Sequence, residues 1–201
     1  LKYHLNILKL IKKYGLTKTI KALGYGQNRY PKGVCFAGIK KEKSIVAIEK
    51  YLKEITKGYK QVIFIDVHTG AARKYKLDLF TNSKEVKKIK IKEIKKVNNI
   101  KKKGLDHIGG LENTFFENSK AKENINLILE FGTINKYSTI LSLKYLSYLL
   151  VRENQITHYG PFEKIKKIRE EMKEAYSPNT KKYKKEVIKK SEVFFKKLIN
   201  F

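Results

Sequence analysis

Apolar residues recur at helical spacing over several long stretches of the chain, with Lys and Glu on the remaining positions. The stretches with this spacing are residues 2–23, 44–57, 133–151, about 161–177 and 179–198. Each predicts an amphipathic helix, and the first is broken at Gly15. We expect Thr133 to cap the third helix and its apolar face, which includes Tyr137 and Leu141, to pack in the core.

Two shorter runs, Gln61–Val67 and Asn124–Glu130, have nearly continuous apolar residues, many of them β-branched. This pattern is typical of strands that are covered on both faces. The glycine-rich segment 24–38 predicts an ordered loop, and the Lys-rich segment 84–103 predicts a solvated helix. Buried strands joined by helices predict a single α/β domain with a layered sheet.

The charge of the chain is large and positive. Lys and Arg number 46 against 19 acidic residues, a formal net charge of +27 over 201 residues. Such a charge favours polyanionic partners, and nucleic acid bound along residues 84–103 is one interpretation. The other is that A/T-rich codons produce the abundant Lys, Ile and Asn, because the lysines are scattered and Arg is rare. We favour this second interpretation.

Cysteine and membrane patterns restrict the class of protein further. Cys35 is the only cysteine, which excludes an intrachain disulfide and a cysteine-based zinc site. We therefore expect a cytoplasmic protein, and no apolar run approaches the roughly 20 residues of a membrane span. The chain begins at Leu1 and its only methionine is Met172, so we expect a piece of a longer protein or a processed product, and export stays open.

The first predicted strand ends in ionisable residues. Side chains alternate along a strand, so Asp66 and His68 should point to the same face. Ligands of open α/β sheets bind beyond the carboxyl ends of the strands. His68 could therefore be a metal ligand with a carboxylate partner, or a structural histidine whose hydrogen bonds are satisfied.

The second predicted strand is apolar until it ends in Glu130. A carboxylate is costly to bury unless it is paired or functional. One interpretation is a general base. The alternatives are a helix N-cap contact and a surface salt bridge.

Four segments in one order carry a family resemblance. They are Gly26-Gln27-Asn28-Arg29-Tyr30-Pro31-Lys32-Gly33, Ile65-Asp66-Val67-His68-Thr69-Gly70, Leu129-Glu130-Phe131-Gly132-Thr133, and the tail from Glu174 through the last helix. In this order they resemble the zinc metallocarboxypeptidase superfamily, above all its largely uncharacterised bacterial and fungal carboxypeptidase-like family with an IDLHTG motif. The resemblance implies a mixed-sheet, three-layer α/β fold with a helical C-terminal tail.

The resemblance also implies roles for three residues. His68 would be a zinc ligand, Glu130 the catalytic general base, and Asp66 a residue that orients the site from behind His68. The implied cofactor is zinc, and the implied reaction is hydrolysis of an amide bond in a peptide or an N-acyl amino acid.

One departure from the family pattern is large. The family supplies two further zinc ligands in an H-x-x-E motif, and this sequence contains none. We therefore expect residues 1–201 to be the C-terminal part of a single carboxypeptidase-like domain, inactive by itself, with the N-terminal zinc-ligand part missing. A catalytically dead homologue and a non-enzymatic nucleic-acid-binding protein are the alternatives.

Overall fold

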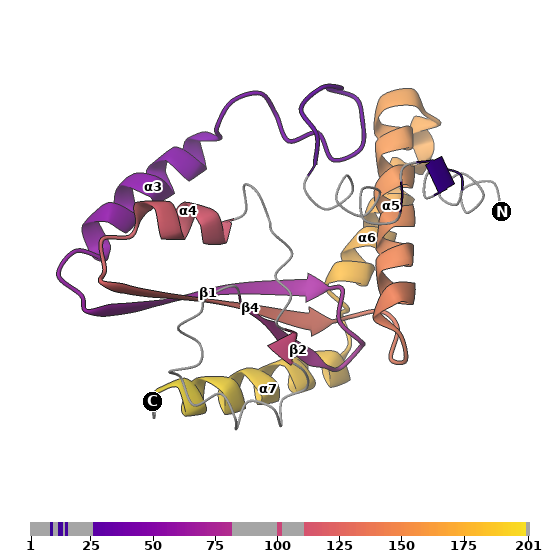
Figure 1. The fold of residues 1–201 in the computed structure, drawn as a ribbon. Helices are drawn as coiled ribbons and strands as arrows, with labels where there is room; N and C mark the ends of the chain where they lie inside the picture. Colours follow the sequence, from indigo (N-terminus) through magenta and orange to yellow (C-terminus); the bar gives the residue numbers. More distant parts are fainter. Residues whose placement is uncertain are drawn as a thin grey trace. The chain divides into compact units, whose positions relative to one another are not determined.

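A computed structural model describes residues 26–81, 100–101 and 111–199, together with the single residues 9, 12, 13 and 15. Its helices are α3 (Lys43–Ile55), α4 (Leu111–Asn118), α5 (Thr139–Tyr159), α6 (Ile165–Tyr176) and α7 (Lys181–Ile199), with a 3₁₀ turn η3 (Phe162–Lys164). Its strands are β1 (Gln61–Gly70), β2 (Leu77–Phe80), β3 (Ile100–Lys101) and β4 (Glu123–Gly132) (Figure 1). The predicted helices of residues 2–23 lie outside this part of the chain.

The chain divides into two compact units. One comprises the described residues of 1–41 and 144–172, and the other those of 42–143 and 173–201. The second unit contains the sheet together with α3, α4 and α7.

The sheet is mixed, and its strand order is β1-β4-β2-β3. Strand β1 runs parallel to β4 in continuous register from Gln61↔Glu123 to Gly70↔Gly132. Strand β2 runs antiparallel to β4 and pairs in parallel with the short β3. This arrangement confirms an α/β protein with a mixed sheet and a helical C-terminal region.

The two predicted strands are confirmed, but they differ in burial. Strand β4 has neighbours on both sides, and Ile125, Leu127 and Leu129 are fully buried. Strand β1 pairs with β4 alone among the described strands, so most of its residues are only half-buried and Val67 is exposed. The expectation that Gln61–Val67 is covered on both faces is therefore wrong.

Helices lie against both faces of the sheet in this unit. On one face, Leu127 and Leu129 pack with Phe194 of α7 in the hydrophobic core. On the other face, the ring of Phe64 stacks on Phe115 of α4 with centroids 5.0 Å apart. The alternation of side chains along β1 and β4 therefore divides the core between α7 and α4.

The start of α5 differs from the sequence prediction. The Asn135 side chain accepts hydrogen bonds from the N–H groups of Tyr137 and Ser138, both at 2.8 Å, and this turn delays the helix to Thr139. Thr133 is therefore not its cap. The predicted core face is also wrong, because Tyr137 is 76% exposed and Leu141 is 50% exposed. Among the residues of α5 whose side chains are described, the buried apolar ones are Leu146, Leu149 and Ile156.

The remaining helices follow their sequence patterns more closely. The predictions for α3, α6 and α7 are confirmed, and α6 ends before Pro178 as expected. Within the predicted helix 84–103, the structure describes only Ile100–Lys101, which form strand β3, so the prediction is wrong for these two residues. The other residues of this prediction lie outside the described chain. Helix α4 and strand β2 were not predicted.

None of the described helices has the length and apolar character needed to cross a bilayer.

Candidate functional site at the strand ends

Ionisable side chains meet where β1 and β4 end. The two strands are parallel, so their carboxyl ends lie at the same edge of the sheet (Figure 1). Their register places His68 directly opposite Glu130. Side chains that are paired in this way across parallel strands point to the same face. The sequence predicted ionisable groups at both strand ends, and the pairing of the strands brings them together.

His68 is held by a carboxylate on its own strand. Its Nε2 lies 2.8 Å from Oδ2 of Asp66, and the two side chains are 49% and 14% exposed. The two residues share a face, as the alternation along the strand predicts. Because Asp66 engages Nε2, the Nδ1 atom is the ring nitrogen that an incoming ligand could use. A metal-binding histidine commonly has its second nitrogen on a carboxylate in this way.

Glu130 is buried at the end of the central strand, with 9% of its surface exposed. Its Oε1 accepts a hydrogen bond of 2.7 Å from the backbone N–H of Ala71. Burial raises the pKa of the Glu130 carboxyl, while the Ala71 N–H and the His68 imidazole act to lower it. Glu130 is therefore neither a surface salt bridge nor the N-cap of α5, which begins at Thr139.

Asp78 is a further carboxylate of the site that the sequence analysis missed. It lies on β2 opposite Glu130 in the antiparallel register, and it is only 4% exposed. His68, Glu130 and Asp78 thus form a row across three neighbouring strands. The Asp78 charge also raises the pKa of Glu130. Strand β2 has only four residues, which is too short for a reliable alternation of apolar and polar positions.

Gly132 lies two residues after Glu130 on β4, and its lack of a side chain allows the loop after β1 to pass close to this strand. A Cβ atom at this position would lie well inside contact distance of the backbone oxygens of Ala72 and Arg73. The Gly132 carbonyl accepts a hydrogen bond from the Tyr75 N–H at 3.1 Å, and its own N–H donates to the Lys76 carbonyl at 2.9 Å. The same loop supplies the Ala71 N–H to Glu130. The absence of a side chain at Gly132 therefore supports the geometry around Glu130.

Tyr183 of α7 is a second residue that the sequence analysis missed. Its side chain is buried with 6% exposed, and its hydroxyl has no hydrogen-bond partner in the described part of the protein. Burial, together with the Glu130 charge, raises the pKa of Tyr183 to about 12. A buried hydroxyl without a partner typically costs about 1–3 kcal/mol. The helical pattern of α7 indicates only a core aromatic residue here, so no sequence signal connects Tyr183 with Glu130.

The described residues do not by themselves fit a complete zinc site. Among them, no group of three or more His, Cys, Asp or Glu side chains could hold a metal ion. Catalytic zinc ordinarily takes three protein ligands, and His68 is one imidazole. The geometry therefore supplies a carboxylate-supported histidine and a buried carboxylate.

The fold and the strand-end residues define an α/β protein with a candidate site of ionisable side chains. Residues 2–190 match the model of a family described as "Protein of unknown function (DUF2817)", and the chain belongs to this family. The search of curated proteins and the search of solved structures both found no match.

Proposed function

We propose that this chain carries part of the active site of a zinc-dependent hydrolase of amide bonds. The enzyme would be metallocarboxypeptidase-like or N-acyl amino acid deacylase-like, with the corresponding three-layer fold. The observation that carries the proposal is the position of buried Glu130 opposite His68, which is held by Asp66. The family to which the chain belongs is often linked to M14-like peptidases, which supports the proposal.

Glu130 is proposed as the general base. A carboxylate whose pKa is raised by burial accepts a proton more readily near neutral pH than an exposed one does. It would take a proton from water as the water oxygen forms a bond to the amide carbon. It would return that proton to the amine nitrogen as the carbon–nitrogen bond breaks. The Ala71 N–H, 2.7 Å from Oε1, orients the carboxylate for both transfers.

His68 is proposed as a zinc ligand, with Asp66 as the residue that orients its ring. The contact of 2.8 Å between Nε2 and Asp66 limits rotation of the imidazole and directs Nδ1 away from the carboxylate. The described residues do not provide the remaining zinc ligands. The sequence also has no H-x-x-E motif, which is where the resembling family carries two of them.

The proposal predicts amide hydrolysis that depends on a metal ion. The protein, expressed from its complete reading frame, would be incubated with short peptides and with N-acetyl amino acids, and released amines would be measured with fluorescamine. We expect release from one of these two substrate classes, its loss after treatment with a zinc chelator, and its return on addition of Zn²⁺. Hydrolysis that persists in the chelator, or no release by the zinc-loaded protein, would contradict the proposal.

A further inference from the structure

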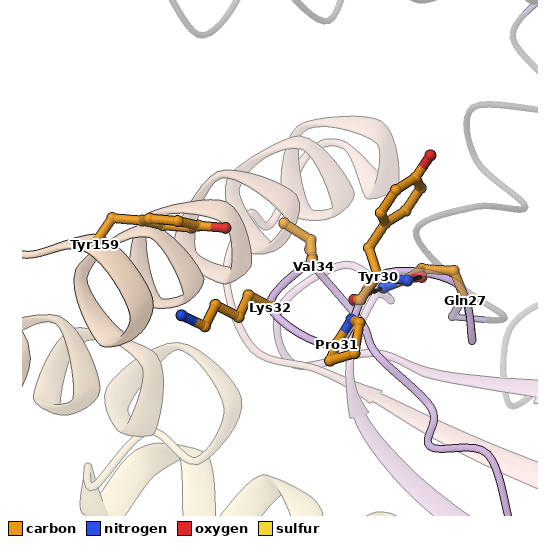
Figure 2. A pocket seen from close by; sticks show the side chains of 7 residues that line it. Gln27, Tyr30, Pro31, Lys32, Val34 and Tyr159 are labelled. Atoms are coloured by element: carbon orange, nitrogen blue, oxygen red, sulfur yellow. Dashed lines mark hydrogen bonds between the residues drawn. The ribbon is translucent and has the colours of Figure 1, made fainter.

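A pocket lies in the other unit, and none of its lining residues has a role in the proposed hydrolysis. It has a volume of about 650 Å³, and the loop after Gly26 and the end of α5 line it. The lining side chains are Gln27, Tyr30, Pro31, Lys32, Val34 and Tyr159. Figure 2 shows the Tyr159 ring reaching from the helix toward Val34, with the Lys32 side chain extending on the same side and Tyr30 beyond Val34. This loop contains one of the four segments that carry the family resemblance, but the proposed roles of Glu130 and His68 do not involve it.

The loop is held in one conformation by hydrogen bonds within the unit. The Gln27 Oε1 atom accepts hydrogen bonds from the N–H groups of Arg29 and Tyr30 at 2.9 and 2.7 Å, and its Nε2 donates to the Tyr30 carbonyl. The Asn154 side chain of α5 donates to the Lys32 carbonyl at 3.0 Å. The backbone of this loop is therefore positioned before any ligand binds, which lowers the entropic cost of binding.

The lining combines exposed aromatic rings with cations. Tyr30 and Tyr159 are each 60% exposed, although both have large apolar surfaces. The Arg29 guanidinium lies 5.4 Å from the centre of the Tyr30 ring, and the Lys32 ammonium lies at the pocket. No acidic residue is among the described residues of this lining, and the sequence of residues 1–41 contains ten Lys or Arg and no Asp or Glu.

We propose that this pocket binds a nucleotide unit of a single-stranded nucleic acid, a function beyond the proposed hydrolysis. A base would stack on an exposed tyrosine ring, and Lys32 and Arg29 would contact the flanking phosphates. Single-strand-binding proteins combine these two features, stacking rings and a cationic groove. An acidic peptide would use the cations but would leave both rings without a matching surface. The rings therefore favour the nucleic acid.

The test is a binding titration that separates stacking from charge. A fluorescein-labelled oligothymidylate of about twelve residues would be titrated with the protein between about 50 and 200 mM salt, and fluorescence anisotropy would be measured. Tyr159→Ala and Tyr30→Ala should each weaken binding about fivefold or more, because a stacking surface is lost. Lys32→Gln should lower the salt dependence by about 0.7, the value for one phosphate contact with a single strand.

Matched controls come from exposed residues of the other unit. Tyr59→Ala removes a ring that is 62% exposed, and Lys53→Gln removes an exposed ammonium, so neither should change the affinity by more than about twofold. All the substituted side chains are exposed, and equal thermal stability of the variants would show that they fold.

Three results would overturn the proposal. One is tyrosine variants that bind as tightly as the wild type, which would leave only non-specific attraction between charges. Another is polyphosphate or a duplex that competes as well as the single strand, because neither presents an unstacked base. The third is tighter binding of a poly-glutamate peptide, which would make the pocket an acidic-peptide site. Chelation of zinc should not alter the binding, so this test and the hydrolysis assay fail independently.

Discussion

Replacing Gly132 by alanine is expected to lower the free energy of unfolding by about 3 kcal/mol, the upper end of what overpacking usually costs. The added methyl group would collide with the backbone oxygens of Ala72 and Arg73. Backbone atoms cannot rotate out of the way as a flexible side chain can. Relief would require the loop to move, which would break its hydrogen bonds between Tyr75 and Gly132 and between Gly132 and Lys76.

Urea denaturation would measure this effect, with Gly58→Ala as the matched control. Gly58 has a φ of +86°, and a Cβ there would meet no atom within 4 Å. Its replacement should therefore cost only the backbone strain of that conformation, about 1 kcal/mol. If Gly132→Ala were no more destabilising than Gly58→Ala, the close crossing of the loop over β4 would be wrong.

The second large effect is expected from Glu130→Gln. Glutamine keeps the size of the side chain and can still accept the Ala71 N–H, but it cannot act as a general base. In the protein from its complete reading frame, amide hydrolysis should fall by about 10²- to 10⁴-fold. The same substitution should stabilise the fold at neutral pH, because it removes a buried charge and burial raises the pKa of the Glu130 carboxyl.

The raised pKa of Glu130 determines the direction in which the stability of the fold changes with pH. The pKa of Glu130 is higher in the folded state than in the unfolded state. The contribution of protonated Glu130 to the free energy of unfolding is therefore fully present at pH values below the unfolded pKa, near 4.3. This contribution is lost as the pH rises through the folded pKa. The wild type should lose stability across this range relative to Glu130→Gln.

Denaturation at a series of pH values would measure the difference between the two proteins. The exposed Glu192, changed to glutamine, is the control and should leave the pH profile unchanged. A Glu130→Gln variant that is less stable than the wild type and retains its hydrolytic activity would contradict the assignment of Glu130 as a buried general base.

The elements that the sequence predicted well are those with long periodic patterns. Helices α3 and α7 span 13 and 19 residues, and each shows several repeats of its apolar spacing. The contact between Asp66 and His68 follows from the alternation along one strand, so it needed no knowledge of the rest of the fold.

The parts that the sequence did not predict depend on contacts between distant segments. Asp78 joins the site only because β2 returns antiparallel to β4. The Glu130 charge raises the pKa of Tyr183 only because α7 packs against the same sheet. The burial of β1 was overestimated because a run of apolar residues does not show whether the strand lies at an edge, as β1 does among the described strands. The turn at Asn135 overrode the apolar periodicity at the start of α5.

Zinc content, measured by mass spectrometry on protein purified from the complete reading frame, tests the central claim most directly. The comparison is between the wild type, His68→Ala and His158→Ala, a histidine of α5 outside the site. The wild type and His158→Ala should each hold about one zinc per chain, and His68→Ala should lose most of it while keeping its fold, since His68 is half exposed. Full zinc content in His68→Ala would contradict the assignment of His68 as a ligand and, with it, the proposed active site.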